Sequence, residues 1–343
     1  MILAAILARY LMGTICEIDA ANETQIAAAF DEAARVERMI STWRGDSELS
    51  TGRYSPELVS LIRSVEAWRE KTGGAFEPRI RPLIDAWKTR ADGAVPDATT
   101  IANALSKIRS GDAPIEEGGF GKGYALDRMM TKIAGDAVIN FGGQIVVRGS
   151  APVTIADPRH RDRALVALTL HDASLSTSSG SEKTFIVNGR QFTHIIDPRT
   201  GEALPPRGSV SVIASSATDA DILSTALYVM GVDEGVRWAN AHDVAALFID
   251  DGRCTASNRF PKFIPLTRPS ATLSPLRGAR GNASSIHAPH PVFGHPFPAL
   301  RGEGQRIVDS FSARQRIIDC SSPRWRGEGD RRTDERGSSK GLI

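Results

Sequence analysis

Apolar residues recur at helical spacing in two long stretches near the start of the chain. In the first, residues 22–40, the apolar positions are three or four apart: Ile26, Phe30, Ala33, Val36 and Ile40. This spacing predicts an amphipathic helix. A second helix is predicted from Ser55 to Gly73, because serine is a favourable N-cap, Pro56 suits the first helical position and glycine can end the helix. A third, short helix is predicted at 98–108.

From Ala137 to Asp250 the pattern changes to short β-branched and aliphatic runs that are separated by Gly, Asp and Pro. Such runs are typical of strands joined by tight turns. Helices that precede a series of strands predict an α+β fold with mostly antiparallel sheets and flanking helices, rather than alternating βαβ units.

The first residues, MILAAILARYLMGT, also have an apolar run. We interpret this run as a first strand and not as an export signal, because no basic residue precedes it and no small-residue cleavage site follows it. No run reaches the ~18 apolar residues that a membrane-spanning helix needs, so no transmembrane span is expected.

After Leu266 the periodic pattern ends. Residues 267–343 are rich in Pro, Gly, Ser and Arg and contain a crude repeat, PLRGARG, PALRGEG and PRWRGEG. The repeat has no periodic apolar face to bury, so it does not predict a solenoid. We therefore expect one domain at 1–266 and a disordered tail at 267–343.

Composition and charge narrow the class of protein. The 343 residues are 41% hydrophobic, which is typical of a globular protein, and the formal net charge is +2. From Thr267 onward there are 13 Lys/Arg and 7 Asp/Glu, so the preceding residues are mildly acidic and do not indicate a nucleic-acid binder. The 3 cysteines are far apart and support neither a disulfide framework nor a zinc site. They leave the compartment undecided.

A glycine-rich bend, GGFGKG at 118–123, precedes a helical run. Glycines let the backbone approach a ligand closely, the start of a helix offers free N–H groups to an anion, and Lys122 adds a positive charge suited to phosphate. The segment matches neither the P-loop nor the dinucleotide-binding glycine pattern, so a tight strand-to-helix turn with a solvated lysine remains an alternative. Asp127, a few residues later, is expected to interact with the helix N-terminus.

A further helix is predicted in ATDADILSTALYVMG, with Thr218 or Asp219 as its N-cap. Asp221 and Thr225 are four residues apart and therefore lie on one face of this helix. A carboxylate and a hydroxyl so placed are hard oxygen ligands suited to Mg²⁺. The alternative is a capping Asp and a Thr that bonds back to the helix backbone.

His194 lies at the end of an alternating strand and leads into the turn DPRTG, in which Asp197 begins a strong turn signal. Histidine, with an ordinary side-chain pKa of ~6.5, is suited to accept a proton from an attacking hydroxyl. A lone histidine on a strand is more often structural, and the hypothesis of a base rests on the coincidence of this loop with the two segments above. Trp43 lies in a predicted loop, where it could stack on a flat ligand or equally cap the core.

Taken in order, these segments resemble one family, the FAD:protein FMN transferases of the ApbE type. The resemblance runs from about Met12 to Leu266 and rests on an ordered series of motifs: MGT, S-x-W with DSEL, GAFEP with PLIDAW, GKGYALD, NFGG, STSSG, HIIDPRTG and ADILST. It implies an enzyme that uses Mg²⁺ to move FMN from FAD onto a Thr or Ser hydroxyl of an acceptor protein and releases AMP. By the same resemblance, the acceptor is expected to be a redox or electron-transport subunit.

The resemblance also implies roles for individual residues. Asp221 and Thr225 match metal-binding side chains, with the backbone carbonyl of Gly119 as a further ligand, and His194 matches the proposed base. Lys122 matches a cofactor-binding position, and its charge beside a pyrophosphate also predicts a catalytic role. Independently of the resemblance, Asp197 or a metal-bound hydroxide could replace His194 as the proton acceptor. The remaining positions that match cofactor contacts are Met12, Trp43, Ala75, Phe76, Glu77, Glu116 and Ile195.

Three positions depart from the family pattern, which usually has Asp where this chain has Glu77 and Glu116, and commonly Tyr where it has Trp43. The altered carboxylates leave open a flavin-binding or flavin-delivery protein without transfer activity. A second alternative is a metal-dependent FAD pyrophosphatase, which would use water in place of the acceptor hydroxyl. Family members usually carry an export or lipoprotein signal. The lack of one in this sequence favours a cytoplasmic location, with the periplasm or inner-membrane surface as the alternative.

Overall fold

The computed structural model describes residues 5–88, 95–181, 184–266 and 315–317. Two strands open the chain, and helices dominate the residues up to 130. The elements of this first part are β1 (Ala5–Leu11), β2 (Thr14–Ala20), α1 (Glu23–Ile40), α2 (Glu48–Thr51), α3 (Pro56–Lys71), α4 (Arg81–Lys88), α5 (Ala98–Arg109), the 3-10 helix η1 (Glu117–Gly119) and α6 (Gly121–Met130).

Strands dominate the second part, and α7, which is kinked at the non-helical Gly231, crosses it. Its elements are β3 (Ala137–Phe141), β4 (Gln144–Asp157), β5 (His160–Ser179), β6 (Thr184–Val187), β7 (Arg190–Thr193), β8 (Ser209–Ala214), α7 (Ala217–Ala241), β9 (Ala245–Asp250), β10 (Arg253–Ala256) and β11 (Ile264–Pro265). In the predicted tail the structure describes only β12 (Gln315–Ile317). The rest of that tail lies outside the described residues.

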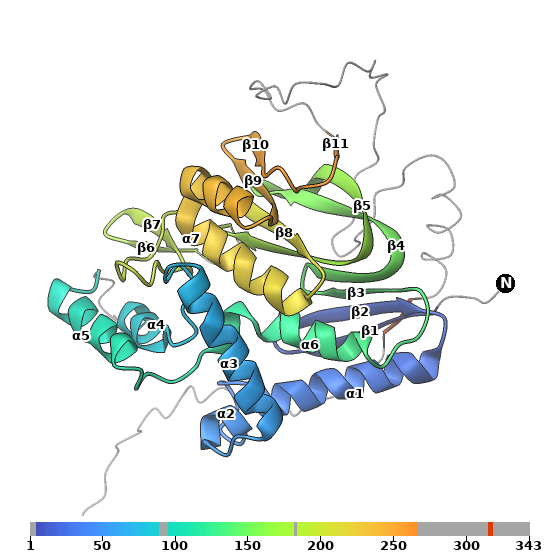
Figure 1. Ribbon diagram of the computed structural model, residues 1–343, viewed down its shortest axis with the longest axis horizontal. Coiled ribbons are helices and arrows are strands. Elements are labelled where there is room, and N and C mark those ends of the chain that lie inside the picture. Colours follow the sequence, from blue (N-terminus) through green and yellow to red (C-terminus); the bar gives the residue numbers. More distant parts are fainter. Residues whose placement is uncertain (1–4, 89–94, 182–183, 267–314, 318–343) are drawn as a thin grey trace, which may run out of the picture.

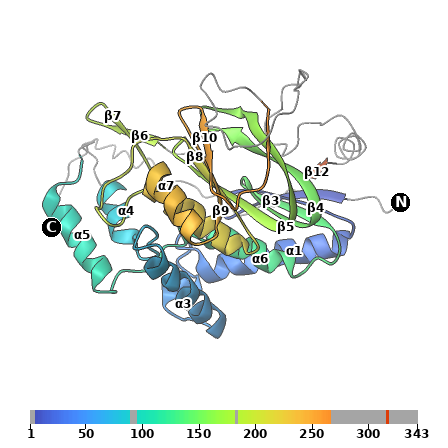
Figure 2. The same ribbon diagram turned by 45° about the horizontal axis from the view of Figure 1, so that its top comes forward.

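Among the described residues, ten strands form one sheet with the order β10-β9-β8-β5-β4-β3-β2-β1-β12, and β11 pairs with β5. All neighbouring pairs are antiparallel except β1 and β12. Helices α1, α6 and α7 lie along one face of this sheet, and the small hairpin β6-β7 lies beside α4 and α5 (Figures 1 and 2). The expected α+β fold with mostly antiparallel sheets and flanking helices is confirmed.

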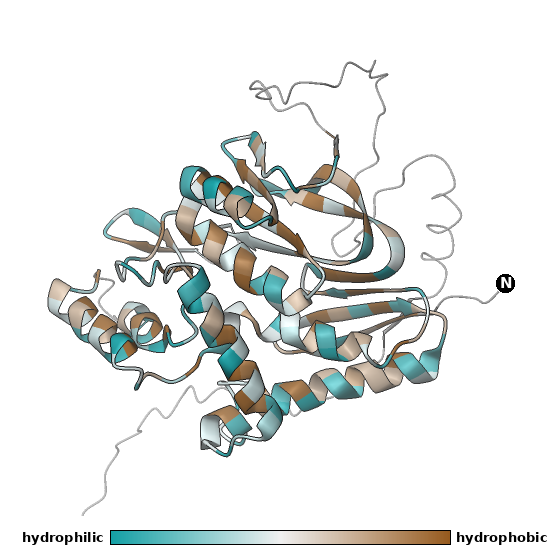
Figure 3. Ribbon diagram, in the orientation of Figure 1, coloured by the Kyte–Doolittle hydropathy of each residue, from teal (hydrophilic) through white to brown (hydrophobic). Residues whose placement is uncertain are grey.

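The three helices predicted from the first half of the chain are present, with ends within a residue or two of the expected ones. Asn22 caps α1, and the Ser55 side chain accepts a hydrogen bond from the Leu58 amide at the start of α3. The apolar positions predicted in α1 are all buried, and they form one core with β2, β3, α6 and α7. Apolar and polar positions alternate around α1 in Figure 3.

Two hairpin turns lie at the same end of the sheet. Met12 and Gly13 join β1 to β2, and Gly142 and Gly143 join β3 to β4. All four residues have positive φ, as expected for two-residue hairpin loops. A Cβ atom on Gly142 would lie 2.7 Å from the Thr14 side chain, so the two turns are in contact.

In the described part of the chain, no helix combines the length and the apolarity needed to cross a bilayer.

Candidate active site

The glycine bend and the helix that carries Asp221 and Thr225 are in direct contact. The backbone N–H of Gly123 donates a hydrogen bond to Asp221 Oδ2 at 3.1 Å. A Cβ atom on Gly119 would lie 3.9 Å from Thr225 Oγ1. Two segments about one hundred residues apart in the sequence therefore place a carboxylate, a hydroxyl and a glycine backbone at one point.

Helices α6 and α7 cap each other. Asp221 of α7 accepts from Gly123 in the first turn of α6. In return, Asp127 of α6 accepts from the backbone N–H of Ala217 at 2.7 Å and of Thr218 at 2.9 Å, and also from the hydroxyls of Ser216 and Thr218. Because free N–H groups at a helix start attract a negative charge, each carboxylate stabilises the other helix.

Asp221 is almost fully buried, with 5% of its surface exposed. Burial raises the pKa of this carboxyl, while the charge of Lys122, the Gly123 N–H and the Ser176 hydroxyl oppose that rise. Of its two oxygens, Oδ2 accepts from Gly123 at 3.1 Å, whereas Oδ1 has only a long 3.5 Å contact with Ser176. Oδ1 therefore has the greater capacity to accept a further ligand.

The donor set fits a hard divalent cation. Asp221 supplies a carboxylate, Thr225 a hydroxyl, and the Gly119 carbonyl belongs to the adjacent bend. Mg²⁺ is typically held by one or two protein carboxylates, with water and substrate phosphate as the other ligands. No three His, Cys, Asp or Glu side chains cluster within the described ranges, so a donor set of the zinc type is not found there. Asp221, Thr225 and Gly119 are thus the residues that could hold Mg²⁺.

The segment GAFEP connects the glycine bend with the DPRTG turn. A Cβ atom on Gly119 would lie 3.1 Å from the Phe76 ring, and one on Gly74 would lie 3.8 Å from Arg199 Cγ. Ala75, Phe76 and Ile195 belong to one large hydrophobic core, and Met12 packs against it. Of these four predicted cofactor contacts, Phe76 is the one that the distances place next to the glycine bend.

Glu77 and Glu116, the two carboxylates at which this chain departs from the family pattern, each pair with an arginine. Arg69 Nε lies 2.6 Å from Glu77 Oε2, and Arg81 Nη1 lies 3.2 Å from Glu116 Oε2. Burial raises the pKa of both carboxyls, and the paired arginines oppose the rise. Arg69 belongs to α3 and Arg81 to α4, so two different helices hold the longer side chains.

His194 follows directly after β7 and is exposed. Asp197, in the same turn, is buried and receives Arg199 on both oxygens, from Nε to Oδ1 at 3.0 Å and from Nη2 to Oδ2 at 3.0 Å. Arg199 Nη1 also donates to Glu234 of α7 at 2.8 Å. This ion-paired turn is therefore connected to the part of α7 that follows the kink at Gly231, whereas Asp221 lies in the part before it.

Trp43 lies in the loop between α1 and α2 with 83% of its surface exposed. The exposed ring does not cap the core. Its position is consistent with the other interpretation from the sequence, in which the ring stacks on a flat ligand. Lys88 Nζ lies 5.2 Å from the centre of its ring.

The model of the ApbE family matches residues 12–248, which is more than half of the chain. The chain belongs to the ApbE family. Among the relatives that it matches are two named FAD:protein FMN transferase, one from Klebsiella pneumoniae and one from Treponema pallidum. The first is 27% identical over 278 residues, which cover 71% of this chain and 88% of the relative. The second is 28% identical over 310 residues, which cover 73% and 86%.

Solved structures of the ApbE family share the fold. The flavinyl transferase ApbE from Pseudomonas stutzeri matches with a TM-score of 0.65 and 21% identity over 75% of this chain and 95% of its own. The apbe protein from Thermotoga maritima matches with a TM-score of 0.68 and 25% identity over 74% and 97%.

Two local predictions for this ApbE chain were wrong. The N-cap of α7 is Ser216 and not Thr218 or Asp219, because Ser216 has extended backbone angles and its side chain accepts from the Asp219 amide. The glycine bend begins within the 3-10 helix η1, which includes Gly118 and Gly119, and residues 114–116 before it do not form the strand expected of a strand-to-helix turn. In addition, Asp127 lies at the seventh position of α6 and caps α7, not the helix to which it belongs.

Sequence reasoning missed the side chains that hold the site together. Asp127 was noted only for its own helix, Arg199 was seen only as part of a turn, and Ser176 and Ser178 only as part of a motif. The alternation of STSSG could have placed Ser176 and Ser178 on one face of a strand. The sequence gave no signal that this face meets α7.

Proposed function

We propose that this chain is an FAD:protein FMN transferase that uses Mg²⁺ to move FMN from FAD to a Thr or Ser hydroxyl of an acceptor protein, with release of AMP. The observation that carries the proposal is the contact between the glycine bend and α7, which gathers hard oxygen donors and Lys122 within a chain of the ApbE family. The relatives named FAD:protein FMN transferase support the same activity.

The proposed reaction is a displacement at phosphorus. The acceptor hydroxyl oxygen attacks the phosphorus nearer riboflavin, a new P–O bond forms, and the bond from that phosphorus to the bridging oxygen breaks. AMP leaves with the bridging oxygen. Negative charge builds up on the pyrophosphate oxygens during this step, and positively charged groups beside them lower the barrier.

Each residue of the chain has a defined task in this proposal. Lys122 neutralises charge on the pyrophosphate, a role consistent with the effect of its charge on the neighbouring Asp221. Asp221, Thr225 and the Gly119 carbonyl would hold Mg²⁺, which when bound supplies Lewis-acid stabilisation of the phosphate oxygens.

His194 accepts the hydroxyl proton as the new bond forms. Its exposed position at the start of the turn is open to an incoming acceptor protein. Both oxygens of Asp197, the alternative proton acceptor, receive hydrogen bonds from Arg199. We therefore assign Asp197 to the positioning of the turn.

The FAD-binding surface is proposed to include the apolar cluster of Met12, Ala75, Phe76 and Ile195, with Glu77 and Glu116 as polar contacts. The paired arginines keep each glutamate in a defined position. Trp43, with its ring exposed, is proposed to stack on the flavin or adenine ring.

One assay separates this function from the two alternatives. The purified chain is incubated with FAD, Mg²⁺ and a panel of candidate acceptor proteins, and both in-gel flavin fluorescence and free AMP are measured. A fluorescent acceptor together with AMP supports the transferase. AMP with free FMN and no labelled acceptor would instead identify a pyrophosphatase, and bound FAD with neither product would identify a flavin-binding protein.

A further inference from the structure

Three serine hydroxyls connect the two side chains proposed to hold the cation. Ser178 Oγ lies 3.3 Å from Thr225 Oγ1 and 2.8 Å from Ser224 Oγ. Ser224 Oγ donates to the backbone carbonyl of Asp221 at 3.0 Å, and Ser176 Oγ lies 3.3 Å from Ser224 Oγ. Strand β5 thus contributes two hydroxyls from one of its faces, and α7 contributes the others.

The number of protons and lone pairs on each hydroxyl determines which hydroxyl donates and which accepts in this series of hydrogen bonds. A hydroxyl has one proton and two lone pairs, so an oxygen that turns a lone pair toward a cation must give its proton to an acceptor elsewhere. Ser224 gives its proton to the Asp221 carbonyl, and Ser178 can then donate to Ser224. Ser178 Oγ is left with lone pairs that can accept the proton of Thr225.

Thr225 has one other acceptor within the same reach. The Thr225 hydroxyl also lies within donating distance of the Asp221 carbonyl oxygen, at the same 3.3 Å, as the back-bonding alternative expected. That carbonyl shares its lone pairs with the closer Ser224 hydroxyl, so we assign the Thr225 proton to Ser178 when a cation is bound. With the proton on that side, the Thr225 lone pairs are free to face the glycine bend, where a Cβ atom on Gly119 would lie 3.9 Å from Oγ1.

We propose that Ser178 is a positioning residue that takes the Thr225 hydroxyl proton, with Ser224 as its own acceptor, and so directs the Thr225 lone pairs at the divalent cation. The inference rests on the cation site of the proposed function. It concerns the affinity for the metal and not the chemistry of transfer.

The test compares Ser178→Ala with Thr177→Ala in the full chain. Thr177 is the next residue of β5, and its hydroxyl lies 2.8 Å from Ser211 Oγ, away from the site. Mn²⁺ is titrated into the FAD-saturated protein without acceptor, and free Mn²⁺ is read by electron paramagnetic resonance. Because residues that orient metal ligands typically change affinity by about 10-fold or more, Ser178→Ala should bind Mn²⁺ about 10-fold more weakly, and Thr177→Ala should bind like the parent.

A second readout separates positioning from general damage. In transfer assays, the Mg²⁺ concentration for half-maximal rate should rise in Ser178→Ala in parallel with the loss of Mn²⁺ affinity, whereas the rate at saturating Mg²⁺ should be retained. Mn²⁺ affinity within twofold of the parent, or equal weakening in Thr177→Ala, would overturn the role of Ser178.

Asp221→Ala keeps the two proposals distinguishable. If Asp221→Ala loses Mn²⁺ binding while Ser178→Ala does not, the cation site stands and only the serine inference fails. If Asp221→Ala binds Mn²⁺ like the parent, the cation site lies elsewhere and the serine inference falls with it. Mn²⁺ binding is measured without acceptor. The result for Ser178 therefore stands even if no acceptor protein is labelled in the transfer assay.

Discussion

Gly123 has no side chain, and a Cβ atom at this position would lie 2.3 Å from the Ala217 carbonyl oxygen. That distance is shorter than any real contact of this kind, so α6 and α7 can approach this closely only with glycine here. The same approach brings the Gly123 N–H to Asp221. One residue therefore determines both the packing of two helices and the position of a proposed metal ligand.

Gly123→Ala should force the two helices apart and lower the free energy of unfolding by about 1–3 kcal/mol, the usual cost of overpacking. Gly118→Ala is the matched control, because its Cβ would meet nothing closer than Glu116 Oε1 at 3.8 Å. Urea denaturation measures both. Equal stability of the two variants would show that the close approach of the helices is not required.

His194→Ala should slow transfer by about 10²- to 10⁴-fold, the usual contribution of a general base, and should leave FAD binding unchanged. Initial rates at saturating FAD and fluorescence titration of FAD without acceptor measure the two effects. His171→Ala, an exposed histidine paired with Ser150 on the long β4-β5 ribbon, is the control and should match the parent. A variant at 194 that loses FAD affinity but keeps the rate at saturation would contradict the role of base.

At the scale of single residues, local motifs predicted positions: spacing placed Asp221 and Thr225 on one helix, and Trp43 lies in a loop with its ring exposed. The roles of these residues stay predictions. Asp127 and Ser178 could not be assigned their contacts, because those contacts join residues that are 89 and 47 positions apart in the sequence. No local pattern reports such pairs.

At the scale of helices and strands, α7 is held at its N-terminus by a residue of another helix. Asp127 accepts four hydrogen bonds from the first residues of α7, which exceeds what an ordinary N-cap side chain accepts. The cap fixes the start of α7 against α6, one turn before Asp221.

Asp127→Ala should therefore destabilise the protein by about 2 kcal/mol or more, toward the upper end of the range for lost caps. Asn22→Ala, which removes the single side-chain hydrogen bond at the start of α1, is the comparison and should cost less. Thermal unfolding ranks the two variants. A smaller loss for Asp127→Ala than for Asn22→Ala would refute the importance of the reciprocal cap.

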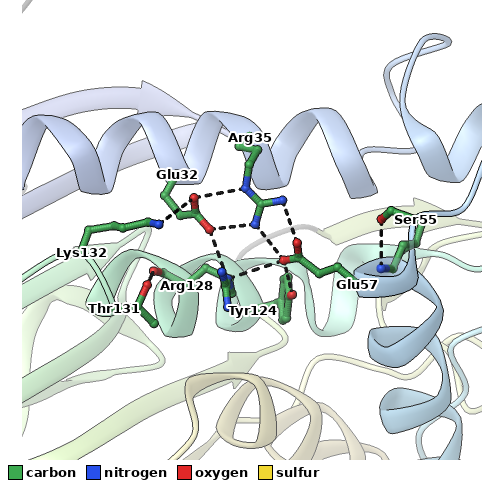
Figure 4. A network of polar contacts seen from close by, with 9 residues as sticks. Glu32, Arg35, Ser55, Glu57, Tyr124, Arg128, Thr131 and Lys132 are labelled. Atoms are coloured by element: carbon green, nitrogen blue, oxygen red, sulfur yellow. Dashed lines mark hydrogen bonds and ion pairs between the residues drawn. The ribbon is translucent and has the colours of Figure 1, made fainter.

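A network of charges joins α1, α3 and α6 (Figure 4). Arg35 pairs with both Glu32 and Glu57 at 2.7 Å, and Arg128 of α6 lies 3.1 Å from Glu32. The Tyr124 hydroxyl donates to Glu57 at 2.6 Å. Because α6 also carries Lys122 and Asp127, this network stabilises the helix on which the proposed phosphate site is built.

The network makes stability depend on pH in acid. Hydrogen bonds from Arg35 lower the pKa of Glu32 from 4.5 to about 2, so the stabilisation is present above pH 4.5 and is lost as the pH falls from there toward about 2. Glu32→Gln should reduce the change in unfolding free energy over this pH range by about 1–2 kcal/mol, a figure that is discounted because solvent screens the partly exposed arginines. Unfolding free energies between pH 6 and pH 2.5 measure it, and an unchanged pH slope in the variant would contradict the prediction.

Helices were easier to predict than the small elements between them. Capping residues and apolar spacing defined α1 and α3 closely, whereas β2 was missed although Cys16, Ile18 and Ala20 alternate inward along it. The short helices α2 and α4 were missed as well. Elements of this length bury few side chains, so their periodic signal is weak.

For the molecule as a whole, the α+β class followed from the order of helices and strands, but the order of the strands in the sheet did not. Strand β5 pairs with β8 across the separate β6-β7 hairpin, and β2 pairs with β3 across all the helices from α1 to α6. Such pairings are decided by the packing of the entire core. The same pairings place the STSSG end of β5 against α7, where Ser178 lies next to Thr225.

The central claim is that the glycine bend and α7 together hold a divalent cation at the pyrophosphate of FAD. The most direct measurement is mass spectrometry of an acceptor protein after incubation with FAD and Mg²⁺, with the parent chain and with Asp221→Asn. The asparagine can still accept the Gly123 hydrogen bond, so the fold should be kept while the charge is lost. With the parent chain we predict an FMN adduct on a Thr or Ser of the acceptor, and with Asp221→Asn we predict that the adduct forms at least about 10²-fold more slowly. An adduct formed equally fast by the variant would contradict the claim.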